Sequence, residues 1–259
     1  MHGWSVSWRD WEGVVAALLE IERLSVRYKG VVAVSDVSLA VNEGEATVIL
    51  GANGAGKTSL LRGISGFWRT EIGTVSGGCV RFDGRDITRL SPGRVARLGV
   101  AIVPETRKVF ASATVRDNLL SVPRLVPRPR YQQLHDTVLE LFPILRERLT
   151  QQAGYLSGGE RQMLGIARGL LLNPRLLLID EATLGLAPVA IDAVFGRLET
   201  IIAELHTTVL LVEQNVGAAM RIARQVHVME TGKLTFSGTK EEMLRSGAAE
   251  AAYLGARAH

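Results

Sequence analysis

The sequence has almost no cysteine and no apolar run long enough to cross a bilayer. Cys79 is the single cysteine of 259 residues, which excludes an intrachain disulfide and a cysteine-based metal cluster and favours a reducing, cytoplasmic compartment. The apolar run at 14–19 is too short for a membrane span. The residues before it, which include Asp10 and Glu12, do not resemble a secretory signal. Work at a membrane would therefore require other chains to hold this one there.

The composition is that of an ordinary globular protein. Hydrophobic residues make up 47% and charged residues 22% of a chain long enough for one large α/β domain with a small appended subdomain. The net charge of +4 suits a phosphate-rich partner or an anionic membrane face. Because the same balance is common on proteins that do neither, it carries little weight.

Residues 1–17 are predicted to be an extension, and the folded domain is predicted to span 18–255. Trp4, Trp8 and Trp11 have the spacing of one helix face, which would allow an interfacial helix. A poorly ordered tail, or a start codon placed too early, is the favoured interpretation because chain termini are commonly disordered.

Strand and helix patterns alternate along the domain. Strands are expected at 19–27, 34–41, 46–50, 100–103, 176–180, 208–212, 226–230 and 233–236, and helices at 57–65, 158–172, 188–204 and 216–223. The glycine-rich residues 72–84 suggest a peripheral antiparallel hairpin. From about 106 to 165 the pattern is helical. These patterns predict an α/β fold with a mostly parallel core sheet, peripheral antiparallel strands and an inserted helical subdomain.

A phosphate-binding loop is the strongest motif. It follows an apolar strand, opens a helix and matches G-x-x-x-x-G-K-[ST]. Its residues are Gly51, Ala52, Asn53, Gly54, Ala55, Gly56, Lys57 and Thr58, followed by Ser59. Glycines let backbone N–H groups approach a phosphate, and the helix N-terminus favours negative charge. Lys57 can reach the β- and γ-phosphates, and Thr58 can place its hydroxyl on Mg²⁺. A glycine turn between core elements is the plainer alternative.

Two carboxylates, Asp180 and Glu181, end the apolar strand at 176–179. Carboxyl ends of parallel strands border the ligand crevice, so both should point toward the phosphates. Asp180 would hold Mg²⁺ through its water shell, and Glu181 would orient and polarise the attacking water. Alone, such a pair is as often a solvated strand end; about 120 residues after a phosphate loop it is a stronger indication.

The segment 156–162, Leu-Ser-Gly-Gly-Glu-Arg-Gln, begins a helix with an apolar stripe. Ser-Gly-Gly alone would be an N-cap and a flexible first turn. The segment resembles the LSGGQ signature of ABC ATPases, and this likeness extends over nearly all of 18–255. It implies the P-loop NTPase fold of ABC ATPases, ATP hydrolysis and a dimer that sandwiches ATP. Ser157, Gly158 and Gly159 would then contact the γ-phosphate of ATP bound to the opposite subunit.

The resemblance implies further roles. Tyr28 lies where an aromatic stacks on adenine, Glu105 at the Q-loop position near Mg²⁺, 183–186 at the D-loop, and Gln214 at the switch position. Glu105 replaces the usual Gln, Gln214 the usual His, and the D-loop lacks its common Asp. Gln214 can donate an N–H to the γ-phosphate but cannot carry a proton, which leaves Glu181 as the base. These departures are expected to change the rate of ATP hydrolysis rather than abolish the activity.

The segments 103–110, 141–148, 185–188 and 212–215 resemble the smaller ATP-binding subunit of branched-chain amino acid importers, whose near relatives serve urea and short-chain amides. This implies membrane permease partners, a second ABC ATPase subunit that is identical or related, and indirectly an external solute-binding protein. It also implies a peripheral place on the cytoplasmic face of the membrane. The segment 67–84 is longer than this subfamily leads us to expect, which weakens the solute assignment.

Two other functions remain open. A soluble ABC ATPase acting on a ribosome or DNA would carry tandem cassettes, long coiled coils or cysteine-rich inserts, none of which this sequence has. A P-loop kinase or GTPase would leave 156–162 unexplained. Arg124, Arg128 and Arg130 are interpreted as a solvated linker, with no nucleic-acid partner, because no aromatic residues are interleaved with them.

Overall fold

A computed structural model describes residues 17–71, 73–106 and 108–246. Apart from Ala17, the predicted N-terminal extension lies outside the described residues, and so do residues 247–255 of the predicted domain. Within the described ranges, no helix combines the length and the apolar character that a bilayer span requires.

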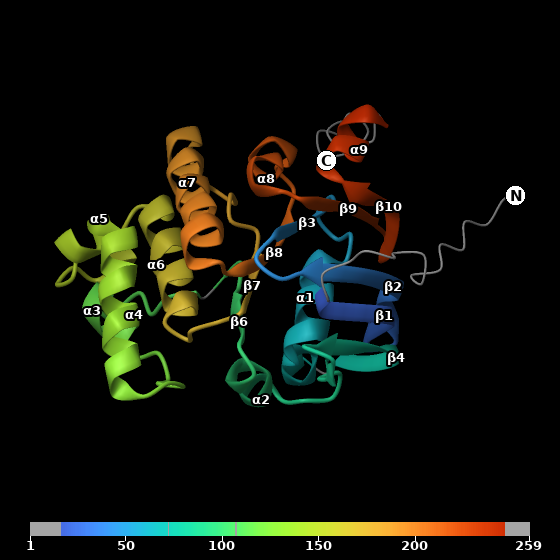
Figure 1. Cartoon of the computed structure of the whole chain (residues 1–259), viewed down its shortest axis with the longest axis horizontal. Helices are drawn as coiled ribbons and strands as arrows, with labels where there is room; N and C mark the ends of the chain where they lie inside the picture. The colour runs from blue at the N-terminus through green and yellow to red at the C-terminus, as the bar shows by residue number, and fades with distance from the viewer. Residues whose placement is uncertain (1–16, 72, 107, 247–259) are drawn as a thin grey trace, which may run out of the picture.

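A six-stranded sheet forms the centre of the molecule, in the order β10-β9-β3-β8-β7-β6 (Figure 1). Its strands are β3 (Ala46–Leu50), β6 (Val100–Val103), β7 (Leu176–Asp180), β8 (Thr208–Glu213), β9 (Gln225–Glu230) and β10 (Lys233–Thr239). All neighbouring pairs are parallel except β9 and β10. The predicted α/β fold with a mostly parallel core sheet is confirmed.

A smaller antiparallel sheet covers one side of the core. Its order is β2-β1-β4-β5, formed by β1 (Ala17–Tyr28), β2 (Val31–Asn42), β4 (Gly73–Phe82) and β5 (Arg85–Asp86). Helix α1 (Lys57–Ser65) lies between the two sheets (Figure 1). Leu60, Leu61 and Ile64 of α1 are fully buried against residues of both sheets. The helix that begins at the phosphate loop is thus held rigidly by apolar packing on two sides.

Helices cover the other face of the core sheet. Those that lie against it are α6 (Gly158–Leu170), α7 (Pro188–Leu205) and α8 (Val216–Ile222). Helices α3 (Val115–Leu120), α4 (Arg128–Leu141) and α5 (Pro143–Glu147) pack on α6 on the side away from the sheet, and α2 (Pro92–Arg97) and α9 (Lys240–Arg245) lie at the periphery. In β7, Leu177 and Ile179 belong to the apolar core with these helices, and Leu176 and Leu178 to the core with α1. Burial on both faces is why this strand is apolar at every position.

The predicted hairpin within 72–84 is wrong in one respect. Residues 73–82 form one strand, β4, which pairs with β1, and the turn comes later, at Asp83 and Gly84. The pairing shifts register near Gly78, which has φ +78. A Cβ there would lie 2.3 Å from the carbonyl oxygens of Glu22 and Arg23. The glycine pattern that suggested a turn instead accommodates a bulge.

His227 is a buried polar residue in β9. It is 7% exposed, and its Nδ1 lies 2.9 Å from Ser237 Oγ on β10. Its Nε2 has no hydrogen-bond partner among the described residues. Burial without an acidic partner disfavours the imidazolium and lowers the pKa of His227 to about 4.

This burial should make folding sensitive to acid. Between about pH 6.5, the usual His pKa, and pH 4, the unfolded chain takes up a proton that the native chain refuses. The free energy of unfolding should therefore fall as the pH drops through this window, by up to about 1.4 kcal/mol per pH unit. In His227→Gln, whose side chain does not titrate, this part of the fall in the free energy of unfolding should be absent when urea unfolding is measured at pH 7.5, 6 and 5. An equally steep decline in the variant would contradict the assignment.

Candidate nucleotide site

A cleft of about 470 Å³ lies beside the phosphate loop. It is lined by the start of β2, the phosphate loop, the carboxyl ends of the core strands and the turn after β9. The lining residues are Val31, Val32, Ala33, Asn53, Gly54, Gly56, Lys57, Thr58, Ser59, Glu105, Glu181, Leu184, Thr231 and Gly232. Most of the predicted phosphate and catalytic residues thus share one cavity.

Close packing explains two glycines of the phosphate loop. A Cβ at Gly51 would lie 2.4 Å from the carbonyl oxygen of Met229, and one at Gly56 would lie 2.4 Å from that of Ala33. Gly56 also has φ +106, a conformation that other residues rarely adopt. The loop is therefore held against neighbouring backbone at both of these glycines.

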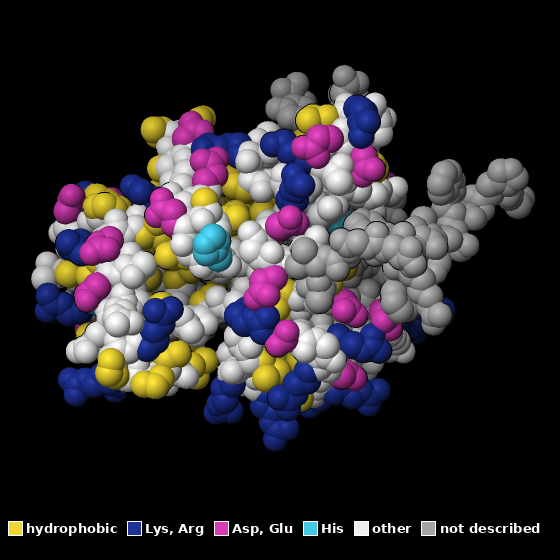
Figure 2. Space-filling view, in the orientation of Figure 1, with side chains coloured by type: hydrophobic (Ala, Val, Ile, Leu, Met, Phe, Trp, Pro, Cys, Tyr) yellow, Lys and Arg dark blue, Asp and Glu magenta, His cyan; other side chains and the backbone are white. Residues whose placement is uncertain are grey.

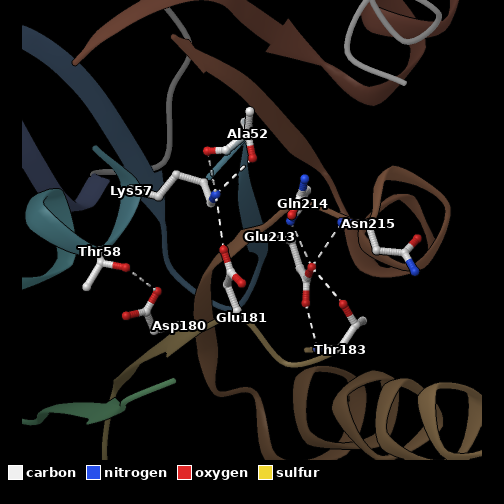
Figure 3. A network of polar contacts seen from close by, with 10 residues as sticks. Ala52, Lys57, Thr58, Asp180, Glu181, Thr183, Glu213, Gln214 and Asn215 are labelled. Carbon is white, nitrogen blue, oxygen red and sulfur yellow. Dashed lines mark hydrogen bonds and ion pairs between the residues drawn. The ribbon is translucent and has the colours of Figure 1, made fainter. Parts of the chain in front are cut away.

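Lys57 lies at the centre of the site (Figure 3). Its Nζ donates to the carbonyl oxygens of Gly51 at 2.8 Å and Ala52 at 3.1 Å, and it lies 3.1 Å from Glu181 Oε1. Both members of this ion pair are nearly buried, with Lys57 4% and Glu181 7% exposed. The Lys57 ammonium group thus lies against carbonyl oxygens of its own loop, with the Glu181 carboxylate beside it.

Asp180 and Thr58 form a second contact. Thr58 Oγ1 donates to Asp180 Oδ1 at 3.0 Å (Figure 3). Burial is the main cause that raises the pKa of Asp180 to about 6, and the nearby carboxylates of Glu105 and Glu181 raise it further. The hydrogen bond from Thr58 has the opposite effect and lowers it. Among the described residues, no group of three or more His, Cys, Asp or Glu could hold a metal alone. A hydroxyl and a carboxylate nevertheless fit Mg²⁺, which usually keeps water and phosphate oxygens as its other ligands.

The backbone of Glu181 turns sharply at the end of β7. Its N–H still donates to the carbonyl oxygen of Val212 at 3.0 Å, and its φ is +49. Left-handed backbone at a residue other than glycine costs about 1–3 kcal/mol and is typical of functional sites. The turn directs the carboxylate toward Lys57.

Glu213 is a site residue for which the sequence analysis assigned no role. It ends β8 beside Gln214, is 1% exposed, and its carboxylate accepts hydrogen bonds from Thr183 and from the backbone of Gln214. Burial raises the pKa of Glu213, and these hydrogen bonds oppose that effect. A charged residue at the carboxyl end of an apolar parallel strand was the available signal.

Ser157 caps helix α6 at the surface. Its Oγ accepts from the N–H of Glu160 at 3.2 Å, and Glu160 Oε2 accepts from the N–H of Ser157 at 2.7 Å, which forms a capping box. Ser157 is exposed, so its side chain is free of its own core. A Cβ at Gly159 would lie 2.9 Å from Ala190 Cβ, and one at Gly158 2.8 Å from Leu186 Cδ2. Among the described residues that line the cleft, none belongs to 157–159.

Tyr28 lies next to the cleft but outside its described lining. Its half-buried ring packs with the core around α1, and a Cβ at Gly73 would lie 2.6 Å from the ring. The cleft wall beyond it is formed by Val31 and Val32, which are 70% and 44% exposed. The structure thus places the predicted adenine-stacking residue beside the cleft without directing its ring into it.

A groove of about 640 Å³ adjoins the site, and Glu105 lines both cavities. Lys108, which follows Glu105 after β6, donates from Nζ to Gln162 Oε1 of α6. Burial lowers the pKa of Lys108. Arg168 of α6 donates to the backbone oxygen of Lys108, and its guanidinium lies 4.8 Å from the ring centroid of Phe110. The segment after β6 is therefore joined to the helix that Ser157 begins.

Sequence comparisons identify relatives over most of the chain. A family model described as ABC transporter matches residues 34–184. The high-affinity branched-chain amino acid transport ATP-binding protein BraG of Pseudomonas aeruginosa is 40% identical over 92% of this chain and 100% of its own. The probable branched-chain amino acid transport ATP-binding protein LivF of Archaeoglobus fulgidus is 36% identical over 88% and 94%. The lipopolysaccharide export system ATP-binding protein LptB of Escherichia coli K12 is 32% identical over 92% and 98%.

Solved structures share the fold. A nucleotide-free ATP-binding cassette from an ABC transporter superposes with a TM-score of 0.80 at 25% identity, covering 92% of this chain and 98% of its own. The ADP conformation of MJ1267, an ATP-binding cassette of an ABC transporter, gives 0.78 at 25% identity and covers 93% and 100%. With the phosphate loop, the paired carboxylates and the capped α6 already in place, the chain belongs to the ABC transporter family and is one of its nucleotide-binding ATPase subunits.

Proposed function

We propose that this chain hydrolyses ATP to drive the import of branched-chain amino acids, working on membrane permease subunits at the cytoplasmic face. The names of two relatives, at 40% and 36% identity, support the solute class. LptB proteins match at lower identity, 32–33%. The observation that carries the mechanism is the meeting of Lys57, Glu181 and the Thr58–Asp180 pair at one cleft.

The phosphate loop and Lys57 bind the triphosphate in this proposal. N–H groups of residues 53–59 surround the phosphates at the start of α1, and Lys57 adds a positive charge that contacts the β- and γ-phosphates. Thr58, Asp180 and Glu105 hold Mg²⁺ directly or through water. Mg²⁺ held there would supply positive charge that neutralises the negative charge developing during phosphoryl transfer.

The adenine end of the cleft is apolar. The exposed side chains of Val31 and Val32 line it, and an aromatic base can cover them. Stacking on Tyr28 stays part of the proposal, since this residue ends β1 three positions before Val31.

Glu181 is the base and Gln214 a γ-phosphate donor. Glu181 already lies 3.1 Å from Lys57, so a phosphate held by that lysine places its attacking water near the carboxylate. Gln214 follows β8, the strand next to β7, and its amide can donate a hydrogen bond without exchanging a proton. Proton removal then falls to Glu181 alone.

A second ABC subunit, identical or related, completes the site. The exposed Ser157 and the first turn of α6 present a hydroxyl, backbone N–H groups and a helix N-terminus to a neighbouring γ-phosphate. The division into an ABC domain at 18–255 with a helical subdomain at about 106–165 belongs to this proposal. It assigns the signature segment to the helical subdomain and the phosphate loop to the rest of the domain.

Coupling to the permease runs through the groove that shares Glu105 with the cleft. Lys108 and Arg168 join the wall of this groove to α6. Figure 2 shows Lys and Arg side chains gathered along the lower edge of the molecule, where α2 and its exposed Arg94 and Arg97 lie. This charge suits a place beside an anionic membrane face.

Reconstitution tests the whole proposal. The tagged chain should co-purify with two multi-span permease subunits. In proteoliposomes that also contain the solute-binding protein, we expect ATP-dependent uptake of labelled leucine, abolished by Lys57→Ala and retained by Glu204→Gln on the exposed surface of α7. Uptake of urea or acetamide in place of leucine would overturn the solute class. ATP hydrolysis stimulated by ribosomes or DNA, with no permease recovered, would overturn the transport role.

A further inference from the structure

We propose that Glu213 is a positioning residue of the hydrolytic site. Its buried carboxylate ties the loop after Glu181 to the loop that carries Gln214, so that the two loops move as one unit. The inference rests on the proposed roles of Glu181 and Gln214 and goes beyond them, because neither role requires a connection between the loops.

Glu213 receives donors from both loops (Figure 3). Its Oε1 accepts from the N–H of Thr183 at 2.8 Å, and its Oε2 accepts from Thr183 Oγ1 at 3.0 Å. The same Oε2 accepts from the N–H groups of Gln214 at 2.8 Å and Asn215 at 3.0 Å. All four partners donate, and three of them are backbone groups, so the carboxylate holds the path of the chain itself.

The sheet explains why one side chain can reach both loops. Strands β7 and β8 are parallel neighbours, with Asp180 opposite Val212. Glu181 and Glu213 therefore leave the sheet at the same edge. Thr183 comes two residues after Glu181, and Gln214 comes directly after Glu213. A displacement of either loop must break bonds to the shared carboxylate or carry the other loop along.

The connection continues into α8. Asn215 is the N-cap of this helix, and its Oδ1 accepts from the N–H of Ala218 at 3.0 Å. Glu213 accepts from the backbone N–H of Asn215, so the start of α8 and the loop after Glu181 are both bonded to the Glu213 carboxylate. The Glu213 carboxylate contacts neither the residues that line the cleft nor Lys57 among the described contacts, and only the Glu213 backbone oxygen reaches the phosphate loop, where it accepts from the N–H of Gly51 at 3.3 Å. The side chain therefore acts through other residues.

Glu213→Gln tests the role with minimal change in shape. The amide keeps one acceptor oxygen but replaces the other with an NH₂ group, which cannot accept from the donor that it faces. The connection between the two loops is therefore weakened, because Thr183 N–H or the donors of Oε2 lose their acceptor. Because small misplacements of reacting groups are costly, kcat for ATP hydrolysis should fall about 10²-fold. The KM for ATP should stay within about threefold, since the substitution leaves Lys57 and the backbone bond between Gly51 and Glu213 in place. Glu204→Gln on the exposed part of α7 is the matched control and should leave both constants unchanged.

A second pair of variants separates positioning from folding. Thr183→Ala removes one of the four donors and should lower kcat about tenfold without raising KM. Combined with Glu213→Gln, it should lower kcat no further, because both changes break the same connection. If Glu213→Gln does not fold, judged by circular dichroism, Thr183→Ala alone decides: an unchanged kcat then overturns the proposal.

The failure of this inference is distinct from that of the proposed function. Loss of hydrolysis in Glu181→Gln with wild-type kcat in Glu213→Gln would overturn only the positioning role. Equal changes of kcat and KM in Glu213→Gln would also overturn it, since they indicate a general structural defect. Wild-type hydrolysis by Glu181→Gln would instead remove the base from the proposed function.

Discussion

Glu181→Gln should lower kcat for ATP hydrolysis by about 10³-fold while ATP still binds. The amide has the shape of the carboxylate but cannot accept the proton of the attacking water. Gln214, the other polar residue proposed for the γ-phosphate, cannot accept it either. Lys57 keeps its bonds to the carbonyl oxygens of Gly51 and Ala52, so the phosphate loop stays ordered. Phosphate release at saturating ATP and Mg²⁺, with binding followed by a fluorescent ATP analogue, measures both properties.

The same variant should reveal the dimer. With hydrolysis blocked, bound ATP remains between the subunits and should convert the protein to a dimer detectable by light scattering. Closing a pair that is mostly open requires about 5.5 kcal/mol of differential binding, which two triphosphates contacted from both sides can provide. The measurement is made with and without a related ABC ATPase subunit, so that both a homodimer and a heterodimer can be detected. Monomers at saturating ATP would end the composite-site model.

Ser157→Asp should lower kcat by about 10²-fold without weakening the binding of ATP to the isolated chain. Asp is as good an N-cap as Ser, so the capping contact with the Glu160 N–H survives and α6 begins at the same residue. The added charge would face the γ-phosphate of the neighbouring subunit and repel it. Ser157→Asn, also a good N-cap but neutral, is the matched control and should keep most of the activity.

The comparison of Ser157→Asp with Ser157→Asn separates the effect of the added negative charge from any effect on the stability of α6. Thermal unfolding should show both variants within about 1 kcal/mol of the parent protein. Steady-state hydrolysis and ATP-dependent dimerisation should then fall together in Ser157→Asp alone. If the Asp variant hydrolyses ATP as fast as the Asn variant, the exposed first turn of α6 does not meet a nucleotide.

The sequence was sufficient to predict the core of the fold. The run at 176–179 is apolar at every position because both faces of β7 are covered, and such a pattern has few alternatives. The phosphate loop had a recognisable motif because its residue types are set within eight consecutive positions, although Gly51 and Gly56 also pack against Met229 and Ala33, which are distant in the sequence. In both cases the feature is recorded in a short run of consecutive residues.

Features that depend on distant partners were not predictable. Gly78 looks the same in a turn as in a bulge, and only its pairing with β1 decides. The break between α4 and α5 is a different case, because its signal was local: Leu141 and Leu145 continue a helical spacing, but Pro143 between them begins a new helix. The donors of Glu213 include Thr183, 30 residues earlier in the chain, so the carboxylate had no visible partner in its own segment.

The tight contacts of Gly158 with Leu186 and of Gly159 with Ala190 bring the first turn of α6 against the chain that follows Glu181. In the proposed dimer, a shift of that chain during turnover would also shift the turn of α6 that faces the other subunit. Two such sites in one assembly would share a mechanical linkage, so hydrolysis should depend on ATP concentration with a Hill coefficient above one. ATP bound at one site of the proposed dimer would thereby change the rate of hydrolysis at the other site.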